Sequence, residues 1–225
     1  LGYNPFNPAM AGYVVLLISF PRELSLWPDT GRILDLQQTL QLVFSGTLPD
    51  TLSLDAITMA TPLDVVKTRL GLSETLTEIQ ESATFGSFAG VGWEWINLWF
   101  LLGGLWLIQQ RIIKWQIPAG MLAGLSLTAL LFYLLNPDVY ASPLFHSFSG
   151  AAMLGAFFIA TDPVSASTTP RGRLYFGFGI GVLTYVIRTW GGYPDGVAFA
   201  VLLMNMAAPT IDYYTRPHVF GHGDS

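Results

Sequence analysis

Cysteine is absent from the 225-residue sequence, and histidine occurs only at His146, His218 and His222. The absence of cysteine excludes disulfides, thiolate-bound iron–sulfur clusters and a cysteine nucleophile within this chain. None of the three histidines falls in the middle of an apolar segment, which argues against a haem held by two histidines. We therefore expect any redox role to depend on an organic cofactor, and we expect no metal site.

Charged residues are also scarce, at 11% of the chain, whereas 52% of the residues are hydrophobic and 14% are aromatic. Soluble domains carry about 25% charged residues, so this composition indicates a membrane protein. Lipid is therefore an expected partner, and nucleic acid is not. The chain begins at Leu1 inside a Gly/Pro/Asn-rich motif, and we expect it to be a fragment that lacks N-terminal spans.

Six apolar segments are candidates for membrane helices. Residues 93–110, 117–135 and 174–192 approach the roughly 20 apolar residues that a helix needs to cross a bilayer. Three further segments are short or broken: 8–20, 149–161 and 196–211. The last of these contains Pro209 near its end, and the first is stopped by Pro21. The pattern predicts an all-α polytopic membrane protein.

Basic residues in the loops all fall on one side of the bilayer if the six segments alternate in direction. Positive charge favours the cytoplasmic side, so we assign five residues to that side: Arg111, Lys114, Arg171, Arg173 and Arg216. The connection 21–92 then lies on the periplasmic side, and it is acidic, with nine Asp or Glu residues against four Lys or Arg residues. Connections of this length without a function are uncommon.

Two of the short segments share a pattern. GYNPFNPAMAGYVVLL begins the first segment and GGYPDGVAFAVLLMN begins the last, and the assigned topology gives them opposite directions. This favours an inverted repeat with short broken helices, although two helices that both begin near proline could match by chance. Broken helices expose backbone N–H and C=O groups. We therefore expect Asn7, Pro8 and Asp162 to lie near a ligand site on the cytoplasmic side.

Polar and small residues inside the apolar segments have two interpretations. GFGIG, residues 177–181, resembles a dinucleotide-binding loop, but no strand precedes it, and small residues here favour close helix packing. Asn97, Thr184, Asn205 and Arg188 are functional candidates because polar groups in membranes are costly. Those near the ends of segments can instead extend toward water.

The stretch LDAITMATPLD, residues 54–64, stands out in the acidic connection because small residues and threonines surround Thr61. A threonine hydroxyl is a poor nucleophile without a base, and no histidine is near in sequence, so catalysis by Thr61 is not expected. The hydroxyl could be esterified by a modifying enzyme, or the stretch could be an ordinary loop. Lys67 and Arg69 are the nearest bases; they could pair with a phosphate or could be solvated helix residues.

DAITMATPLD resembles the covalent flavin-attachment motif of two related families, the D subunits of Rnf (Rsx) electron-transport complexes and the B subunits of sodium-pumping NADH:quinone reductases. In that motif an Asp, two variable residues, Ser or Thr, a small residue and Ala precede the accepting Thr. Asp55, Thr58, Ala60 and Thr61 match, and Met59 stands at the small position. Three further blocks resemble the same families: GYNPFNPAMAGYVVLLISFP, FFIATDPVSASTTPRGRLYFG and IRTWGGYPDGVAFAVLLMNMAAPTID.

The resemblance implies that FMN is joined through its phosphate to Thr61 on the outer side, with riboflavin as a second, non-covalent flavin. It implies a membrane subunit that passes electrons between ferredoxin- or NADH-linked subunits, coupled to movement of Na⁺ or H⁺. The implied partners are the other Rnf subunits and a flavin transferase that modifies Thr61. The implied location is the inner membrane of a bacterium, and we do not expect the chain to be active alone.

The expected organisation is a short membrane helix at 1–20, a periplasmic flavin-bearing region at 21–92, a bundle of about five spans at 93–216 and a cytoplasmic tail at 217–225. The wording of the block around Arg171 and the ending DYYTRPHVFGH favour the Rnf family. The B subunit of the sodium pump is an alternative. A transporter without redox activity is another, since inverted repeats with broken helices are typical of transporters. A structural scaffold is a further alternative, which predicts neither a bound flavin nor transport.

Overall fold

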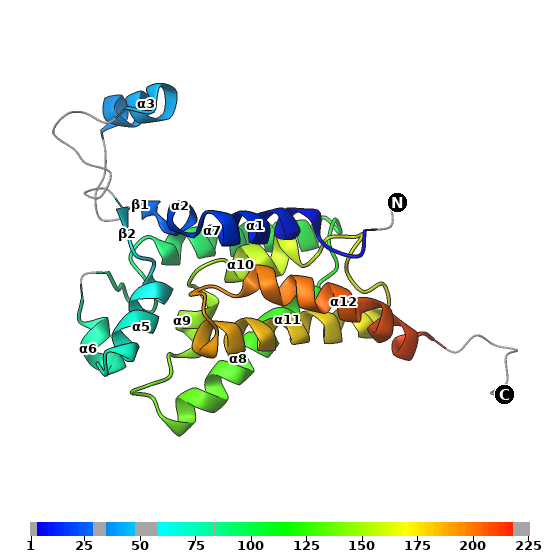
Figure 1. The fold of residues 1–225 in the computed structure, drawn as a ribbon. Coiled ribbons are helices and arrows are strands. Elements are labelled where there is room, and N and C mark those ends of the chain that lie inside the picture. Colours follow the sequence, from blue (N-terminus) through cyan, green and yellow to red (C-terminus); the bar gives the residue numbers. More distant parts are fainter. Residues whose placement is uncertain (1–3, 29–34, 48–57, 83, 218–225) are drawn as a thin grey trace, which may run out of the picture.

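Helices that lie side by side form the body of the protein, and a smaller helical unit covers one end (Figure 1). The computed structural model describes residues 4–28, 35–47, 58–82 and 84–217. The body contains α1 (Pro8–Ser19), α7 (Trp93–Gln109), α8 (Gln116–Leu135), α9 (Pro143–Ser147), α10 (Ala152–Leu154), the π-helical turn η1 (Gly155–Ile159), α11 (Pro170–Trp190) and α12 (Val197–Thr215). Between α1 and α7 lie α2 (Pro21–Ser25), β1 (Trp27–Pro28), α3 (Leu36–Ser45), β2 (Thr58–Met59), α5 (Pro62–Gly71) and α6 (Leu76–Gln80).

Two of the described helices are both long enough and apolar enough to cross a membrane, α8 with 20 residues and α12 with 19. The helical class predicted from the sequence is confirmed, whereas the number of spans and the inverted repeat stay predictions. The prediction that the last segment is short and broken was wrong. α12 continues through Pro209 to Thr215, as membrane helices can when neighbouring groups compensate for the missing proline N–H.

Glycines bring the backbones of α8 and α11 into direct contact. A Cβ atom on Gly181 would overlap the carbonyl oxygen of Met121, and one on Gly124 would overlap the carbonyl oxygen of Phe178. Gly120 and Gly177 meet the opposite backbone in the same way. The expectation that GFGIG packs helices closely is confirmed. The contacts also show that α8 and α11 run in the same direction, because residues further along one helix meet residues further along the other.

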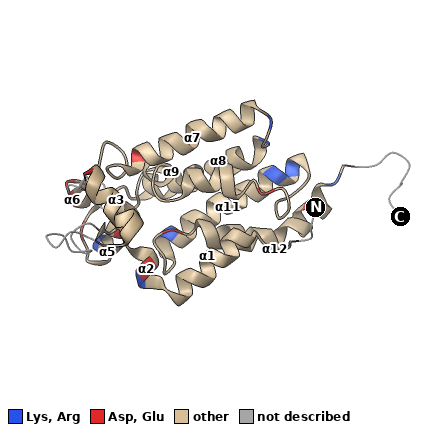
Figure 2. Ribbon diagram, turned by 90° about the horizontal axis from the view of Figure 1, so that it is seen from above, with Lys and Arg blue, Asp and Glu red and all other residues tan. Residues whose placement is uncertain are grey.

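The two ends of the helical body differ in charge. The loop between α7 and α8, the start of α11 and the end of α12 lie at one end, where Lys and Arg residues gather (Figure 2). The helices α5, α6 and α9 lie at the opposite end, and α1 and α12 run side by side in opposite directions (Figure 1). The separation of charge predicted from the loops is therefore present in the fold.

A break in the helical path between α9 and α10 is held by polar side chains of other helices. Gly150 adopts a positive φ of 57° there. The Arg188 guanidinium donates to the carbonyl oxygens of His146, at 2.6 Å, and Ser149, at 3.0 Å. Asn97 Nδ2 donates to the carbonyl oxygens of Phe148 and Gly150. Asn97 and Arg188, two of the polar functional candidates, therefore hydrogen-bond backbone carbonyl groups. Such groups must be paired wherever water is excluded.

Arg188 also pairs with Asp195, with Nη2 3.1 Å from Oδ1. The second carboxylate oxygen of Asp195 accepts from the Ala151 amide at 2.7 Å. The pKa of His146 is lowered to about 3, mainly by burial and secondly by the nearby guanidinium of Arg188. The imidazole is therefore neutral at pH 7, which avoids a second positive charge beside Arg188.

The glycine contact gives a direct test of the body of the protein. We expect Gly181→Ala to lower the free energy of unfolding by about 1–3 kcal/mol, because the added methyl group must push α8 and α11 apart. Thermal unfolding of the detergent-solubilised protein measures this change. Gly12→Ala in α1 is the control, since a Cβ there meets nothing within 4 Å. Equal stability of the two variants would contradict the close contact.

Candidate functional site

Thr61 is the N-cap residue of α5. Its Oγ accepts a hydrogen bond from the amide of Asp64 at 3.2 Å, and its carbonyl oxygen accepts from the amide of Val65 at 2.9 Å. The side chain is partly exposed. Threonine is a favoured N-cap residue, and Pro62 suits the first helical position. Thr61 is thus fixed at the start of a helix.

The residues before Thr61 are only partly described. Thr58 and Met59 form β2, which pairs antiparallel with β1 through Pro28 and Trp27. Ala60 is exposed and leads directly into Thr61. Asp55, the first residue of the attachment motif, lies outside the described residues. Three of the four predicted motif residues therefore lie together on β2 and the cap of α5.

A small hydrophobic core keeps α5 and α6 on the body of the protein. Leu63 and Val66 of α5, with Leu76 and Ile79 of α6, pack against Phe145 of α9. Pro62 lies directly over Gly90, where a Cβ atom would overlap the proline Cγ. Pro62, which follows Thr61, is therefore packed between this core and the loop that precedes α7.

Lys67 provides a polar link between α5 and the body. Its ammonium group donates to the carbonyl oxygens of Arg188 and Tyr193, each at 3.1 Å, and to that of Gly191. These carbonyls lie at and just beyond the C-terminus of α11, where a positive charge is favourable. Burial lowers the pKa of Lys67, and Asp64 partly opposes this shift. The Lys67 ammonium group is thus hydrogen-bonded to the end of α11 and is not available to pair with a phosphate near Thr61.

Arg69 differs from Lys67 in its surroundings. Its Nε donates to Glu74 at 3.1 Å, and about a third of each of the two side chains is exposed. Beside it, a groove of about 510 Å³ follows α5 and has Ala60, Asp64, Thr68, Arg69 and Ser82 among its walls. Sequence reasoning did not find Ser82, because it belongs to no motif and only the fold brings it to α5. The groove gives Thr61 an adjacent space that could hold an organic group.

The residues predicted for the other end of the molecule also come together. The Asn7 side chain donates to the carbonyl oxygen of Ile159 at 3.2 Å, and the Asp162 amide reaches the same oxygen at 3.3 Å. The backbone amide of Asn7 donates to Asn205 Oδ1 at 2.9 Å. The Asp162 carboxylate accepts from the Ser165 hydroxyl at 2.6 Å. Asn7 and Asp162 are thus neighbours that hold the start of α1 against the loop after η1, and Pro8 is the first residue of α1.

Comparison with known proteins gives consistent matches along the chain. The family model described as "NQR2, RnfD, RnfE family" matches residues 1–221. A protein of Vibrio cholerae, named as the D subunit of an ion-translocating oxidoreductase complex, is 56% identical over 233 residues, covering 99% of this chain and 67% of that protein. Proteins of the same name from Alcanivorax borkumensis and Pseudomonas paraeruginosa are each 58% identical, covering 100% and 99% of this chain and 65% and 63% of their own length. The chain thus spans about two thirds of the length of these relatives.

The link through Lys67 can be tested by hydrogen exchange. We expect Lys67→Met to leave three carbonyl oxygens without their charged donor, at a cost of about 1.5–3 kcal/mol. The amides of residues 62–71 should then exchange faster than in the wild type, as measured by mass spectrometry. Thr68→Ala, on the exposed side of the same helix, should leave their exchange unchanged. Unaltered exchange in Lys67→Met would show that α5 is held by its apolar core alone.

Proposed function

This chain belongs to the NQR2, RnfD, RnfE family, and from that premise we propose that it is the flavin-carrying membrane subunit of a bacterial ion-translocating oxidoreductase complex of the Rnf type. The three relatives named as D subunits of such a complex support this assignment. In this proposal the chain relays electrons between ferredoxin- or NADH-linked subunits, coupled to movement of Na⁺ or H⁺. It works only as one part of the complex.

The observation that carries the proposal is the position of Thr61. The residue matches the attachment motif, it is half-buried, and it caps a helix whose N-terminus favours negative charge. Pro62 has no N–H, and the Asp64 amide already donates to Thr61 Oγ at 3.2 Å, so this oxygen lies at the N-terminus of α5. The residues around Thr61 therefore fit a phosphate group on this oxygen, with open space beside it.

Attachment would proceed on the threonine oxygen of this chain. A flavin transferase would join Oγ to the phosphorus of an activated flavin nucleotide, and the bond from that phosphorus to its leaving group would break. The hydroxyl proton would pass to a base of the transferase, because no described residue here is placed as a base for Thr61. The product is a phosphodiester with a single negative charge, which the N-terminus of α5 can stabilise without a basic partner.

FMN supplies single-electron and two-electron chemistry when it is bound, and the protein supplies position and electrostatics. The Pro62–Gly90 contact and the core of α5 and α6 would fix the attachment point relative to the bundle. Because α5 lies at the end opposite to the basic loops, the proposal assigns Thr61 to the periplasmic side of the inner membrane. The other subunits of the complex and the flavin transferase are the proposed partners, with lipid around the bundle.

A second, non-covalent flavin, riboflavin, is proposed at the other end, near Asn7 and Asp162. These residues meet where α1 begins and where the helical turn η1 ends, so both helix termini are close together. The alternatives are the B subunit of a sodium-pumping NADH:quinone reductase and a transporter without redox activity. A covalent flavin excludes the transporter, and the name shared by the relatives favours the Rnf type.

The attachment site is tested by replacing Thr61. We expect the wild-type chain, produced together with the flavin transferase, to give a fluorescent band under denaturing conditions and an intact mass increased by esterified FMN. Thr61→Ala should lose both signals. It should also lose about 1 kcal/mol of stability, because it removes a helix cap.

Thr61→Asn separates these two effects, because asparagine can cap α5 but offers no hydroxyl for the ester. It should remain as stable as the wild type and still lack flavin. Thr58→Ala leaves the acceptor oxygen in place and should retain some flavin. Covalent FMN on the Thr61→Asn chain would contradict the assignment.

The proposed second flavin site is tested at Asp162. Asp162→Ala in the assembled complex should lower the rate of electron transfer and the content of riboflavin, while the covalent FMN on Thr61 remains. Ser165→Ala removes the hydroxyl partner of Asp162 but keeps its carboxylate, so it controls for the turn that the two residues form. Equal losses in both variants would assign Asp162 a structural role only.

A further inference from the structure

The groove beside α5 is lined by Ala60, which directly precedes Thr61, and by residues along the helix as far as Arg69. Asp64, Thr68 and Arg69 line it from one face of the helix, since residues about four apart in a helix are neighbours on its surface. The Asp64 amide that contacts Thr61 Oγ belongs to the same residue that forms the groove wall. Across the groove, Ser82 Oγ is buried and makes no hydrogen bond within the described part of the chain. A polar atom is thus left in the wall for a ligand.

The length of the groove decides what Arg69 can reach. With a rise of about 1.5 Å per residue, Arg69 lies roughly 12 Å along the helix from Thr61. This separation is too long for Arg69 to contact a phosphate on Thr61 Oγ. It does suit the far edge of a ring system that is joined to the phosphate through an extended ribityl chain.

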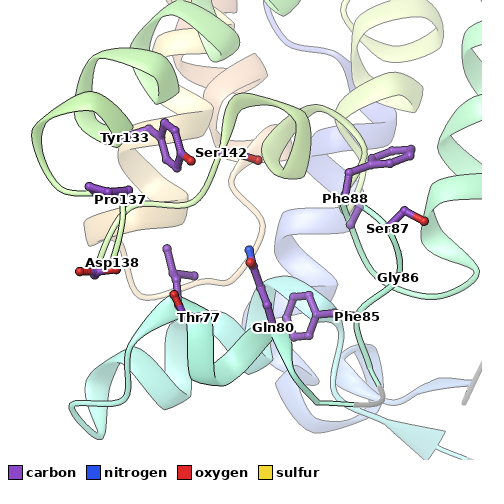
Figure 3. A pocket seen from close by; sticks show the side chains of 12 residues that line it. Thr77, Gln80, Phe85, Gly86, Ser87, Phe88, Tyr133, Pro137, Asp138 and Ser142 are labelled. Atoms are coloured by element: carbon purple, nitrogen blue, oxygen red, sulfur yellow. The ribbon is translucent and has the colours of Figure 1, made fainter.

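A second cavity at this end of the molecule is a poorer match for such a ring. It has a volume of about 330 Å³ and lies between α6, the loop before α7 and the end of α8 (Figure 3). Its walls include Gln80, Tyr133 and Asp138, and no described residue of α5 or of the attachment motif lines it. An acidic residue borders each space, Asp64 in the groove and Asp138 in this cavity, so the absence of α5 from these walls is what makes the cavity the poorer match.

We infer that the groove along α5 holds the isoalloxazine ring of the flavin carried on Thr61, and that Arg69 interacts with the pyrimidine edge of that ring. This inference rests on the proposed attachment of FMN to Thr61. The ion pair of Arg69 with Glu74 occupies only Nε, so the terminal nitrogens remain available within the described residues. Charge near this edge of a flavin tunes its reduction potential.

Arg69 and Glu74 give the inference a signed test. The reduced flavin carries negative charge at its pyrimidine edge, so a nearby guanidinium stabilises the reduced form. Arg69→Gln should therefore lower the midpoint potential of the flavin on Thr61. Glu74→Gln should raise it, because it removes the negative charge that offsets Arg69. The measurement is a spectroelectrochemical titration of the whole complex, in which the component missing from Thr61→Asn identifies this flavin.

Lys114→Gln is the control, since it removes one exposed positive charge at the opposite end of the bundle, and it should leave the potential unchanged. The amount of covalent flavin per chain should be the same in Arg69→Gln, Glu74→Gln and Lys114→Gln as in the wild type. Unchanged potentials in both Arg69→Gln and Glu74→Gln, with the flavin attached, would overturn the ring site alone. A wild-type chain without covalent flavin would instead overturn the proposed function, and the ring site with it.

Filling the groove provides an independent measurement. Thr68 is exposed, so Thr68→Trp should fold normally while its indole occupies the space proposed for the ring. We expect the flavin to remain attached to Thr61 and its fluorescence to become more accessible to quenching by iodide. The same quenching in Thr68→Trp and the wild type would show that the ring lies elsewhere.

Discussion

Arg188 joins three parts of the protein at the end that carries Thr61. Its guanidinium donates to two carbonyl oxygens at the break before α10 and pairs with Asp195 in the turn before α12. Its own carbonyl oxygen accepts from Lys67 of α5. A buried charge is costly unless it is paired and fully hydrogen-bonded, and here every partner comes from another segment. The break, the turn before α12 and the helix of Thr61 therefore have to form together.

The helical body provides the frame for this end. The glycine contact sets α8 and α11 at a short distance, and side chains such as Asn97 satisfy the carbonyl groups that the broken helix exposes. An apolar solvent would leave such groups unpaired, so the polar residues inside the bundle are required by its irregular backbone. The outer unit of α5 and α6 adds a small core of its own, which makes Thr61 a fixed point on the surface.

Much of this could be predicted from the sequence, because the signals are local. Low charge and long apolar segments indicate membrane helices, and loop charges indicate which ends lie together. The spacing of small residues in GFGIG predicts close packing, which the contacts of Gly177 and Gly181 confirm. The residues around Thr61 form a contiguous motif, so a single stretch was enough to select this residue as the candidate site.

Tertiary structure alone decided how the neighbouring bases are used. Lys67 and Arg69 look equivalent in sequence, yet Lys67 points to the carbonyls of α11 while Arg69 borders an open groove. Asn97 and Arg188 likewise proved to be partners of a distant backbone break. Asn97 bonds carbonyl groups 51 and 53 residues further along the chain, and Arg188 bonds carbonyl groups 42 and 39 residues before it. The sequence determined which side chains have charge and hydrogen-bonding capacity, and packing determined which partners they meet, because those partners come together only when the chain folds.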